Sequence, residues 1–177
     1  MGSAVELGQL IRTVPGFPRA GVSFKDITTL LKEPRAFRSV IDRLTEPFVE
    51  MNVDVVVGME SRGFILAAPL AYTLGAGFVP VRKLGRLPAE ALRVSYDLEY
   101  GHNTLELHRD AIEPGQRVLV VDDLLATGGT LLATMNLIRQ LGGEVVGLAF
   151  LIELVYLHGR ENLVNPPPIV SLLHYTE

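Results

Sequence analysis

The sequence predicts an α/β fold with an open, mainly parallel, twisted sheet flanked by helices. Apolar runs at 54–58, 78–81, 118–121 and 144–152 have the composition of buried strands. Segments with apolar residues at helical spacing separate these runs. Such an alternation of strand and helix is typical of parallel sheets whose strands are joined by crossover helices.

The remaining elements follow from periodicity and from glycine and proline breaks. In chain order we expect a short helix within 4–13, an extended or turning loop at 14–20, a helix from Pro34 that ends or bends at Pro47, a helix that Gly75 and Gly77 close, a strand at 103–107, a turn at 113–116, a helix that Gly142 and Gly143 stop, and a last strand at 169–173.

The most informative stretch is VLVVDDLLATGGT, residues 118–130. A buried strand leads into Asp122 and Asp123, and a small-residue loop then opens a helix. The amides of such a loop point at an anion, which the helix dipole also favours. The loop's glycines let the backbone approach a phosphate closely. The stretch therefore predicts a site for a phosphate-bearing ligand.

The same stretch offers polar side chains for a sugar. Thr127 and Thr130 add hydroxyl donors, and the two carboxylates can accept hydrogen bonds from vicinal hydroxyls such as those of ribose. A simpler interpretation is a tight strand-to-helix turn with an acidic flank. The combination of the acidic pair with ATGGT favours a sugar phosphate site. The stretch contains neither the nucleoside triphosphatase loop nor the dinucleotide fingerprint.

A second strand-to-helix junction lies at Met-Glu-Ser-Arg-Gly, residues 59–63. Ligands of open α/β sheets bind at the carboxyl ends of strands, so Arg62 is a candidate for a second phosphate group. The nucleophile elbow of a serine hydrolase requires glycine two residues before the serine. Met59 stands at that place, which argues against a hydrolase.

A cationic stretch follows, with Arg82, Lys83, Arg86 and Arg93 among glycine and proline breaks. Its weak periodicity predicts a mobile loop. Either it is a solvated surface loop, or residues 82–100 form a lid that brings cations to a polyanion and excludes water.

Composition narrows the class of protein. The 177 residues fit one domain, and the net charge of −4 implies no nucleic-acid or acidic-membrane partner. The absence of cysteine excludes disulfides and thiol catalysis. The sequence shows no apolar run of membrane-spanning length and no signal-peptide pattern at its start, so we expect a cytoplasmic protein. None of the four histidines has metal-ligand spacing.

VVDDLLATGGT resembles the phosphoribosyl-diphosphate motif of the type I phosphoribosyltransferases. Four further stretches resemble the adenine phosphoribosyltransferase family, and the similarity runs nearly end to end: VPGFPRAGVSFKDITTLL (14–31), GMESRGF (58–64), VPVRKLGRLP (79–88) and DLEYG (97–101). The resemblance implies transfer of the 5-phosphoribosyl group of 5-phospho-α-D-ribose 1-diphosphate to adenine, which gives AMP and diphosphate.

The resemblance also assigns roles to residues. It implies catalytic roles for Glu99, Asp122 and Asp123; a 5′-phosphate site at Ala126, Thr127, Gly128, Gly129 and Thr130; a diphosphate site at Ser61, Arg62, Lys83 and Arg86; and an adenine site at Phe24, Lys25 and Leu154. Two of these have simpler alternatives, because Phe24 is also explained as a core residue and Glu99 as a salt-bridge partner. Many family members have lysine in place of Arg86, so the hydrogen-bond geometry there differs.

The resemblance further implies Mg²⁺ carried mainly by the substrate, no metal site made by the protein alone, and a homodimer. We expect one domain, residues 1–177, with a core at about 34–150 and a base-binding lobe formed over the site by residues 1–33 and 151–177. Two rival functions stay open. One is transfer to another base such as hypoxanthine, guanine or orotate, and the other is a non-catalytic regulator that binds phosphoribosyl diphosphate.

Overall fold

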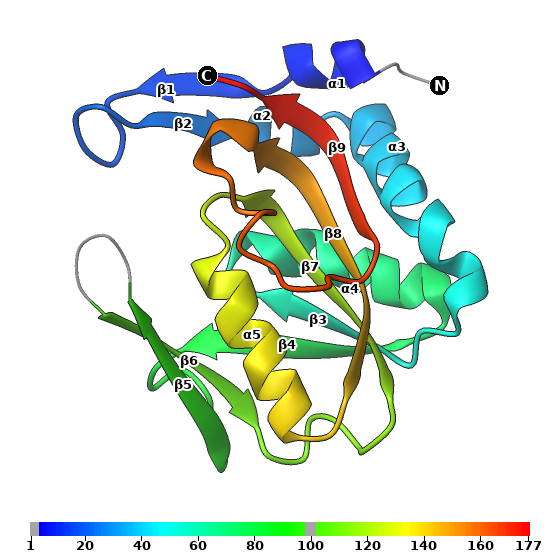
Figure 1. Cartoon of the computed structure of the whole chain (residues 1–177). Helices are drawn as coiled ribbons and strands as arrows, with labels where there is room; N and C mark the ends of the chain where they lie inside the picture. The colour runs from blue at the N-terminus through cyan, green and yellow to red at the C-terminus, as the bar shows by residue number, and fades with distance from the viewer. Residues whose placement is uncertain (1–3, 98–101) are drawn as a thin grey trace. The chain divides into compact units, whose positions relative to one another are not determined.

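The computed structural model describes residues 4–97 and 102–177 (Figure 1). The chain divides into two compact units, Met1–Arg43 and Leu44–Glu177. The larger unit holds the parallel sheet, and each unit is described separately below.

The smaller unit contains a β-hairpin between short helices. Its elements are α1 (Ala4–Gln9), β1 (Arg12–Pro15), β2 (Ser23–Asp26), α2 (Thr28–Leu31) and α3 (Pro34–Thr45), which continues into the larger unit. β1 and β2 pair antiparallel, with Val14 opposite Phe24. The sequence predicted only a loop here, because strands of four residues are too short to show an alternating pattern.

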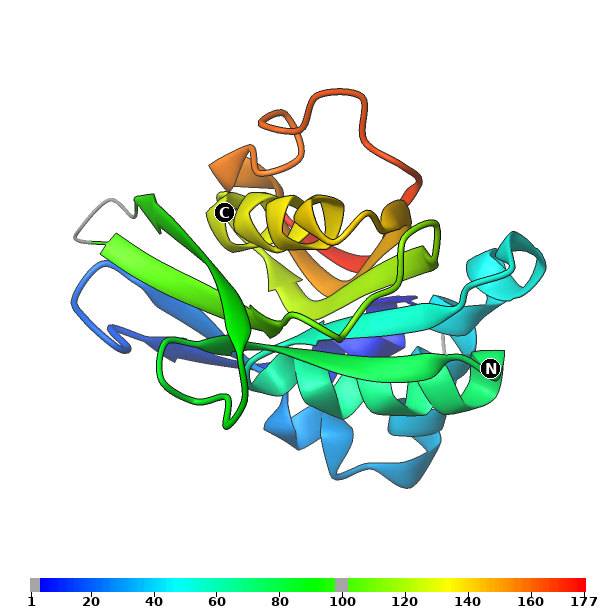
Figure 2. The same ribbon diagram turned by 90° about the horizontal axis from the view of Figure 1, so that it is seen from below.

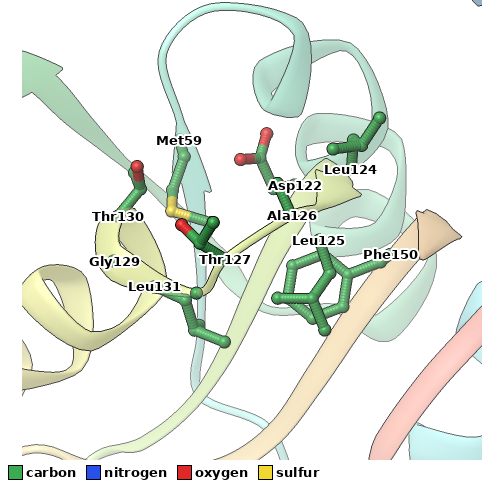
Figure 3. Close-up of a pocket in the computed structure, with 11 residues that line it drawn as sticks. Met59, Asp122, Leu124, Leu125, Ala126, Thr127, Gly129, Thr130, Leu131 and Phe150 are labelled. Atoms are coloured by element: carbon green, nitrogen blue, oxygen red, sulfur yellow. The ribbon is translucent and has the colours of Figure 1, made fainter. Parts of the chain in front are cut away.

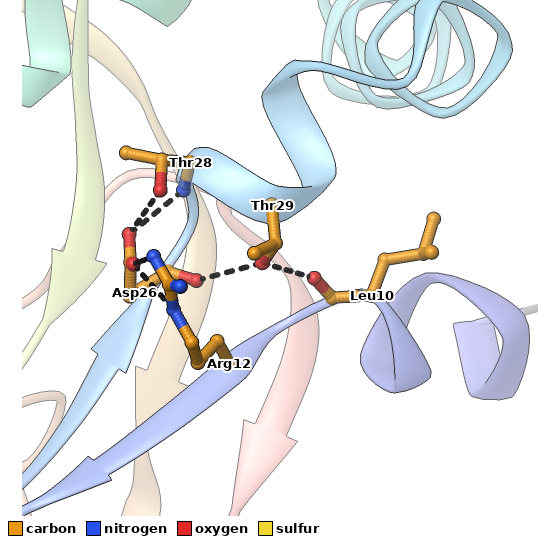
Figure 4. A network of polar contacts seen from close by, with 5 residues as sticks. All are labelled: Leu10, Arg12, Asp26, Thr28 and Thr29. Carbon is orange, nitrogen blue, oxygen red and sulfur yellow. Dashed lines mark hydrogen bonds and ion pairs between the residues drawn. The ribbon is translucent and has the colours of Figure 1, made fainter.

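Asp26 ties the hairpin to the helix that follows it (Figure 4). Its Oδ2 atom accepts a hydrogen bond of 3.0 Å from Nε of Arg12, and its Oδ1 atom accepts the backbone N–H of Thr28 at 2.9 Å. These hydrogen bonds, with Arg12 contributing most, lower the pKa of Asp26 to about 2. The carboxylate therefore stays charged and fixes the end of β2.

Within the described residues, the larger unit forms a seven-stranded sheet in the order β5-β6-β4-β3-β7-β8-β9. The strands are β3 (Val55–Met59), β4 (Gly77–Lys83), β5 (Ala91–Asp97), β6 (His102–His108), β7 (Arg117–Leu125), β8 (Glu144–Leu154) and β9 (Ile169–Tyr175). The helices are α4 (Arg62–Leu74) and α5 (Gly129–Gln140), with the 3-10 turns η1 (Glu46–Met51) and η2 (Val155–Leu157). The predicted α/β fold with a mainly parallel sheet is confirmed.

The strands from β4 to β9 across the sheet run parallel, whereas β6 and β5 are antiparallel additions at one edge. Figure 2 shows α4 and α5 on opposite sides of the sheet. β4 and β8 lie on opposite sides of the central β3–β7 pair, so the chain leaves β3 and β7 in opposite directions. Such a switch point is where open α/β sheets bind ligands, and it lies beside the two predicted junctions.

The cationic stretch is more ordered than the sequence predicted. β4 continues to Lys83, β5 begins at Ala91, and β5 pairs along its length with β6. β5 forms the edge of the sheet, and most of its residues are only partly buried. The sequence of this segment therefore has the polar composition of a loop instead of a buried strand. The expectation of a mobile loop over the whole stretch is therefore wrong for residues 91–97, while closure of a lid stays a prediction.

The carboxyl-terminal segment contributes to the main sheet. β9 pairs in parallel with β8, from Ile169 opposite Leu148 to Tyr175 opposite Leu154. The assignment of residues 151–177 to a base-binding lobe with residues 1–33 stays a prediction. Residues 169–175 belong to the sheet whatever role that segment has at the site.

Gly147 generates a stability prediction, because β8 packs closely against Phe48. A Cβ atom at Gly147 would lie 2.9 Å from Cδ1 of Phe48 and still closer to its Cε1. Phe48 is fully buried and cannot move aside. We expect Gly147→Ala to lower the free energy of unfolding by roughly 1–3 kcal/mol, the usual cost of overpacking. Urea denaturation measures this change.

Gly77→Ala is the matched control. A Cβ atom there would meet only ordinary contacts, the nearest at 3.7 Å from the carbonyl oxygen of Asp54. Equal effects of the two substitutions would contradict the overpacking at Gly147.

Candidate functional site

The candidate site forms at the carboxyl ends of β7 and β3. β7 does not end before the acidic pair but continues through Asp122 and Asp123 to Leu125. Burial alternates along this extension, so the two carboxylates leave the strand on different faces. The sequence placed them side by side as equivalent ligands, whereas the structure gives them different surroundings.

Asp122 lines a pocket together with the loop that follows β7 (Figure 3). The loop residues that line it are Ala126, Thr127, Gly128, Gly129 and Thr130, which are the five predicted phosphate ligands. In Figure 3 the oxygens of Asp122, Thr127 and Thr130 lie in the upper part of the view, above the apolar Leu131. The pocket is therefore lined by both polar and apolar residues, and the predicted loop residues are among them.

The loop has the backbone geometry of an anion site. Gly128 precedes the first residue of α5 and has a φ of 87°, a conformation that side chains with a Cβ rarely adopt. The first amides of a helix have no partner within the helix and are free to bind an anion. Both the strand-to-helix turn and the helix dipole thus favour a phosphate here.

Residues 158–163 brace this loop from outside. The side-chain amide of Asn162 donates a hydrogen bond of 2.9 Å to the carbonyl oxygen of Thr127. Gly159 packs so closely that a Cβ on it would collide with the carbonyl oxygen of Ala126. Arg160 holds the brace to the sheet, since its Nε donates to Oε1 of the buried Glu153 at 3.0 Å. Sequence reasoning missed this brace, because no periodicity or motif marks it.

The second junction meets the first through Arg62 and Gly63. Nε of Arg62 lies 2.8 Å from Oδ2 of Asp123, whose side chain is only 5% exposed. A Cβ on Gly63 would lie 2.7 Å from Oδ1 of Asp122, so only glycine permits the start of α4 to come this close to β7. Ser61 occupies the N-cap position of α4 without a side-chain capping hydrogen bond, and the Glu60–Ser61 peptide is cis. The structure thus brings both predicted junctions together.

Both carboxylates of the acidic pair are desolvated, and the pKa of each is raised. Burial raises the pKa of Asp122 well above its usual range, and the charge of Asp123 raises it further. Burial also raises the pKa of Asp123, although Arg62 opposes this effect. One guanidinium therefore faces two desolvated carboxylates, an arrangement that favours binding of a cationic or hydroxyl-bearing ligand.

Two further carboxylates hold the cationic stretch. Glu60 accepts from Nη2 of Arg82 and from the backbone N–H of Lys83, both at 2.9 Å. These bonds, with Arg82 contributing most, lower the pKa of Glu60. Lys83 and Arg86 are themselves exposed. Glu60 belongs to the stretch GMESRGF, residues 58–64, but no sequence pattern indicated that it links the two segments.

Glu106 in β6 is the second of these carboxylates. Its Oε1 accepts from Nε of Arg93 at 2.8 Å, and its Oε2 accepts from the backbone N–H of Gly85 at 2.7 Å. Burial alone would raise its pKa, but these hydrogen bonds outweigh it and the pKa lies below its usual value. The turn between β4 and β5 is therefore fastened to the sheet next to Lys83.

The predicted adenine residues lie in different units. Phe24 and Lys25 belong to β2 of the smaller unit, where the Phe24 ring meets Phe17 edge to face at 5.1 Å. Nζ of Lys25 lies 3.3 Å from the Thr13 hydroxyl. Leu154 is the last residue of β8 in the larger unit. A purine sandwich of Phe24 and Leu154 stays a prediction, as does the role of Glu99, which lies outside the described residues.

Over residues 4–97 and 102–177, no cluster of three or more histidine, cysteine or acidic side chains could hold a metal ion. In that same part of the chain, no helix has the length and apolar character needed to cross a membrane.

Comparison with known proteins gives a consistent result. A profile of the phosphoribosyl transferase domain matches residues 26–163. The adenine phosphoribosyltransferase of Acidobacterium capsulatum is 59% identical over 171 residues, which cover 97% of this chain and 94% of that protein. The corresponding protein of Solibacter usitatus is 58% identical over 170 residues, covering 96% and 98%.

Solved structures agree. The crystal structure of adenine phosphoribosyltransferase from Rhodothermus marinus has 55% identity and a TM-score of 0.94, covering 97% of this chain and 98% of that one. The Saccharomyces cerevisiae enzyme, solved with an imino-altritol bisphosphate and adenine, has 40% identity and a TM-score of 0.89, covering 96% and 98%. The chain therefore belongs to the phosphoribosyl transferase domain family and, within it, to the adenine phosphoribosyltransferases.

Proposed function

We propose that the chain transfers the 5-phosphoribosyl group of 5-phospho-α-D-ribose 1-diphosphate to adenine, which gives AMP and diphosphate in purine salvage. One observation carries the proposal for this chain's own residues. The glycine loop after β7 and the Arg62 junction after β3 meet at the switch point of the sheet, through Gly63 and the Arg62–Asp123 ion pair.

The loop at 126–130 binds the 5′-phosphate in this proposal. Its amides lie at the start of α5, and its two threonine hydroxyls line the same pocket. Asp122 lines that pocket beside the loop, so a ribose attached to the phosphate has a carboxylate within the same cavity. Asp123 contributes the second carboxylate, already oriented by Arg62.

The diphosphate binds at Ser61, Arg62, Lys83 and Arg86. Glu60 links Ser61 and Arg62 to the segment of Lys83 and Arg86. It follows β3 directly, and it binds the Arg82 side chain and the backbone of Lys83. The cations neutralise the leaving diphosphate, and the carboxylates favour the positive charge that develops on the sugar as the bond to the diphosphate breaks. The 5′-phosphate lies away from the reacting carbon, and the energy of binding it helps to position that carbon.

The acidic pair also fits a divalent cation that arrives with the substrate. Two desolvated carboxylates faced by a single guanidinium leave negative charge to be balanced. Mg²⁺ suits such a place, because it binds through one or two carboxylates together with substrate phosphates. When bound, it supplies further neutralisation of the leaving diphosphate.

The base is adenine, with Phe24 and Leu154 on its two faces and the backbone near Lys25 reading its edge. The yeast relative was solved with adenine, and relatives that are 54–59% identical over 96–97% of this chain carry the adenine name, which supports this choice. Glu99 is the proposed group for the purine proton. We also propose a cytoplasmic protein, with which the cysteine-free sequence is compatible, and a homodimer, which rests on the family resemblance alone.

The direct test of the function compares kcat/KM for adenine, hypoxanthine and guanine with magnesium and phosphoribosyl diphosphate. We expect adenine to be preferred by roughly 10⁴-fold, since a site that hydrogen-bonds the 6-amino edge leaves buried polar groups unpaired against a 6-oxopurine. Equal or better use of either 6-oxopurine would overturn the adenine assignment. Binding of phosphoribosyl diphosphate without turnover of any base would instead favour a regulator.

We predict that the Asp122 carboxylate lowers the free energy of unfolding of the free protein but is needed for substrate use. We expect Asp122→Asn to raise the urea midpoint at pH 7 and to lower kcat/KM by roughly tenfold or more, the value of a charged hydrogen bond. Because the folded-state pKa of Asp122 is raised, the wild-type protein loses stability as the pH rises above the ordinary value of 3.8 and through the folded pKa. The stability gain of the variant should therefore shrink towards pH 4.

Asp110→Asn, at an exposed carboxylate, is the control and should change neither quantity. A urea midpoint for Asp122→Asn at or below that of the wild-type protein at pH 7 would contradict the desolvation argument.

Because residues 158–163 brace the loop, we predict that a substitution outside the pocket can impair phosphate binding. We expect Gly159→Ala to weaken binding of ribose 5-phosphate by roughly tenfold or more, because the added Cβ forces the carbonyl of Ala126 to move. Titration calorimetry measures the affinity, and Gly77→Ala serves as control. Unchanged affinity in a folded Gly159→Ala protein would show that the brace does not shape the loop.

A further inference from the structure

A tyrosine outside the predicted site contacts one of its residues. The phenolic oxygen of Tyr96, in β5, lies 2.9 Å from Oγ1 of Thr130. Thr130 is the second residue of α5 and lines the loop pocket. The two residues are 34 positions apart in the sequence, and no motif signalled their contact. The antiparallel edge of the sheet therefore reaches the proposed phosphate site through this pair of hydroxyls.

The direction of this hydrogen bond depends on what else Thr130 binds. In the free protein either oxygen can donate. A threonine hydroxyl has one hydrogen to donate and two lone pairs that accept, whereas the oxygens of a phosphate dianion only accept. Once Thr130 donates to a phosphate, Tyr96 has to be the donor of the pair. A tyrosine hydroxyl at this place thus leaves the hydrogen of Thr130 available for the ligand.

The Tyr96 ring is held in place by its own strand. It packs against the apolar core of the larger unit, and β5 packs against α5. Tyr96 stands opposite Asn103 of β6, within a continuous register from Ala91 to Asp97. The hydroxyl therefore reaches Thr130 from a strand that is paired with β6 and packed against α5.

We propose that Tyr96 is a positioning residue that orients the Thr130 hydroxyl as a donor to the 5′-phosphate of the substrate. The proposal rests on the proposed function, because it requires the loop at 126–130 to be the phosphate site. It adds to that site a residue that touches no substrate and acts only through Thr130.

The test uses Tyr96→Phe, which removes the hydroxyl and keeps the packed ring. We expect the dissociation constant for ribose 5-phosphate to rise roughly 3- to 10-fold, the value of one hydrogen bond. KM for phosphoribosyl diphosphate should rise by a similar factor while kcat stays within about twofold, because the lost interaction is present in both the ground state and the transition state.

Ser95→Ala is the matched control on the same strand. Its hydroxyl pairs with that of Thr104 at 2.8 Å, and neighbouring residues of a strand face opposite sides. Ser95→Ala therefore removes a similar hydrogen bond from β5 without touching Thr130, and it should leave ribose 5-phosphate affinity unchanged. A loss equal to that of Tyr96→Phe would mean that β5 acts only through its general stability, which would overturn the proposal.

A double-mutant cycle of Tyr96→Phe with Thr130→Val distinguishes an effect of Tyr96 through Thr130 from an effect that is independent of Thr130. We expect Thr130→Val alone to weaken ribose 5-phosphate binding, and Tyr96→Phe to have no further effect in that background. Suppose that Thr130→Val binds ribose 5-phosphate weakly and that adding Tyr96→Phe weakens binding further by the same factor as in the wild-type protein. This result would overturn the role of Tyr96 but not the phosphate site. Unchanged binding in Thr130→Val would overturn the phosphate role of Thr130, and the inference with it.

Discussion

The site depends on the close approach of α4 to the end of β7. At Gly63 the helix start comes so near to Asp122 that no side chain fits, and the neighbouring Arg62 pairs with Asp123. This contact joins two loops that leave the sheet in opposite directions. Without it, the groups proposed for the diphosphate and for the ribose 5-phosphate would belong to two separate loops, and one substrate could not span them.

Stability and function oppose each other at the same contact. Asp122 and Asp123 are desolvated carboxylates next to one another, and their raised pKa values show that the free protein favours losing their charge. Arg62 offsets only part of this cost. In the proposed function, a substrate with hydroxyl donors and a divalent cation compensates for this cost, which couples binding energy to folding energy through the acidic pair.

The conformation of the loop at 126–130, the proposed phosphate site, depends on elements outside it. Asn162 and Gly159 support the loop from one side, and Tyr96 reaches Thr130 from another. The cationic turn is likewise held by Glu60 and Glu106, in addition to a hydrogen bond of its own from Nη1 of Arg82 to the carbonyl oxygen of Arg86. In each case a rigid neighbour fixes a short loop, which keeps ligand-binding groups in place before the ligand arrives.

The sequence by itself determined the local chemistry: the buried strand 118–121, the acidic pair, the ATGGT turn and the alternation that makes the sheet parallel. These features depend on residues adjacent in the chain, so composition and periodicity reveal them. Only the tertiary structure decided that Asp123 pairs with Arg62, that 91–97 is an edge strand, and that Gly159 and Tyr96 meet the segment 126–130. The contacts of Asp123, Gly159 and Tyr96 join residues more than 30 positions apart. All of these features depend on sheet order and side-chain direction, which a single sequence does not display.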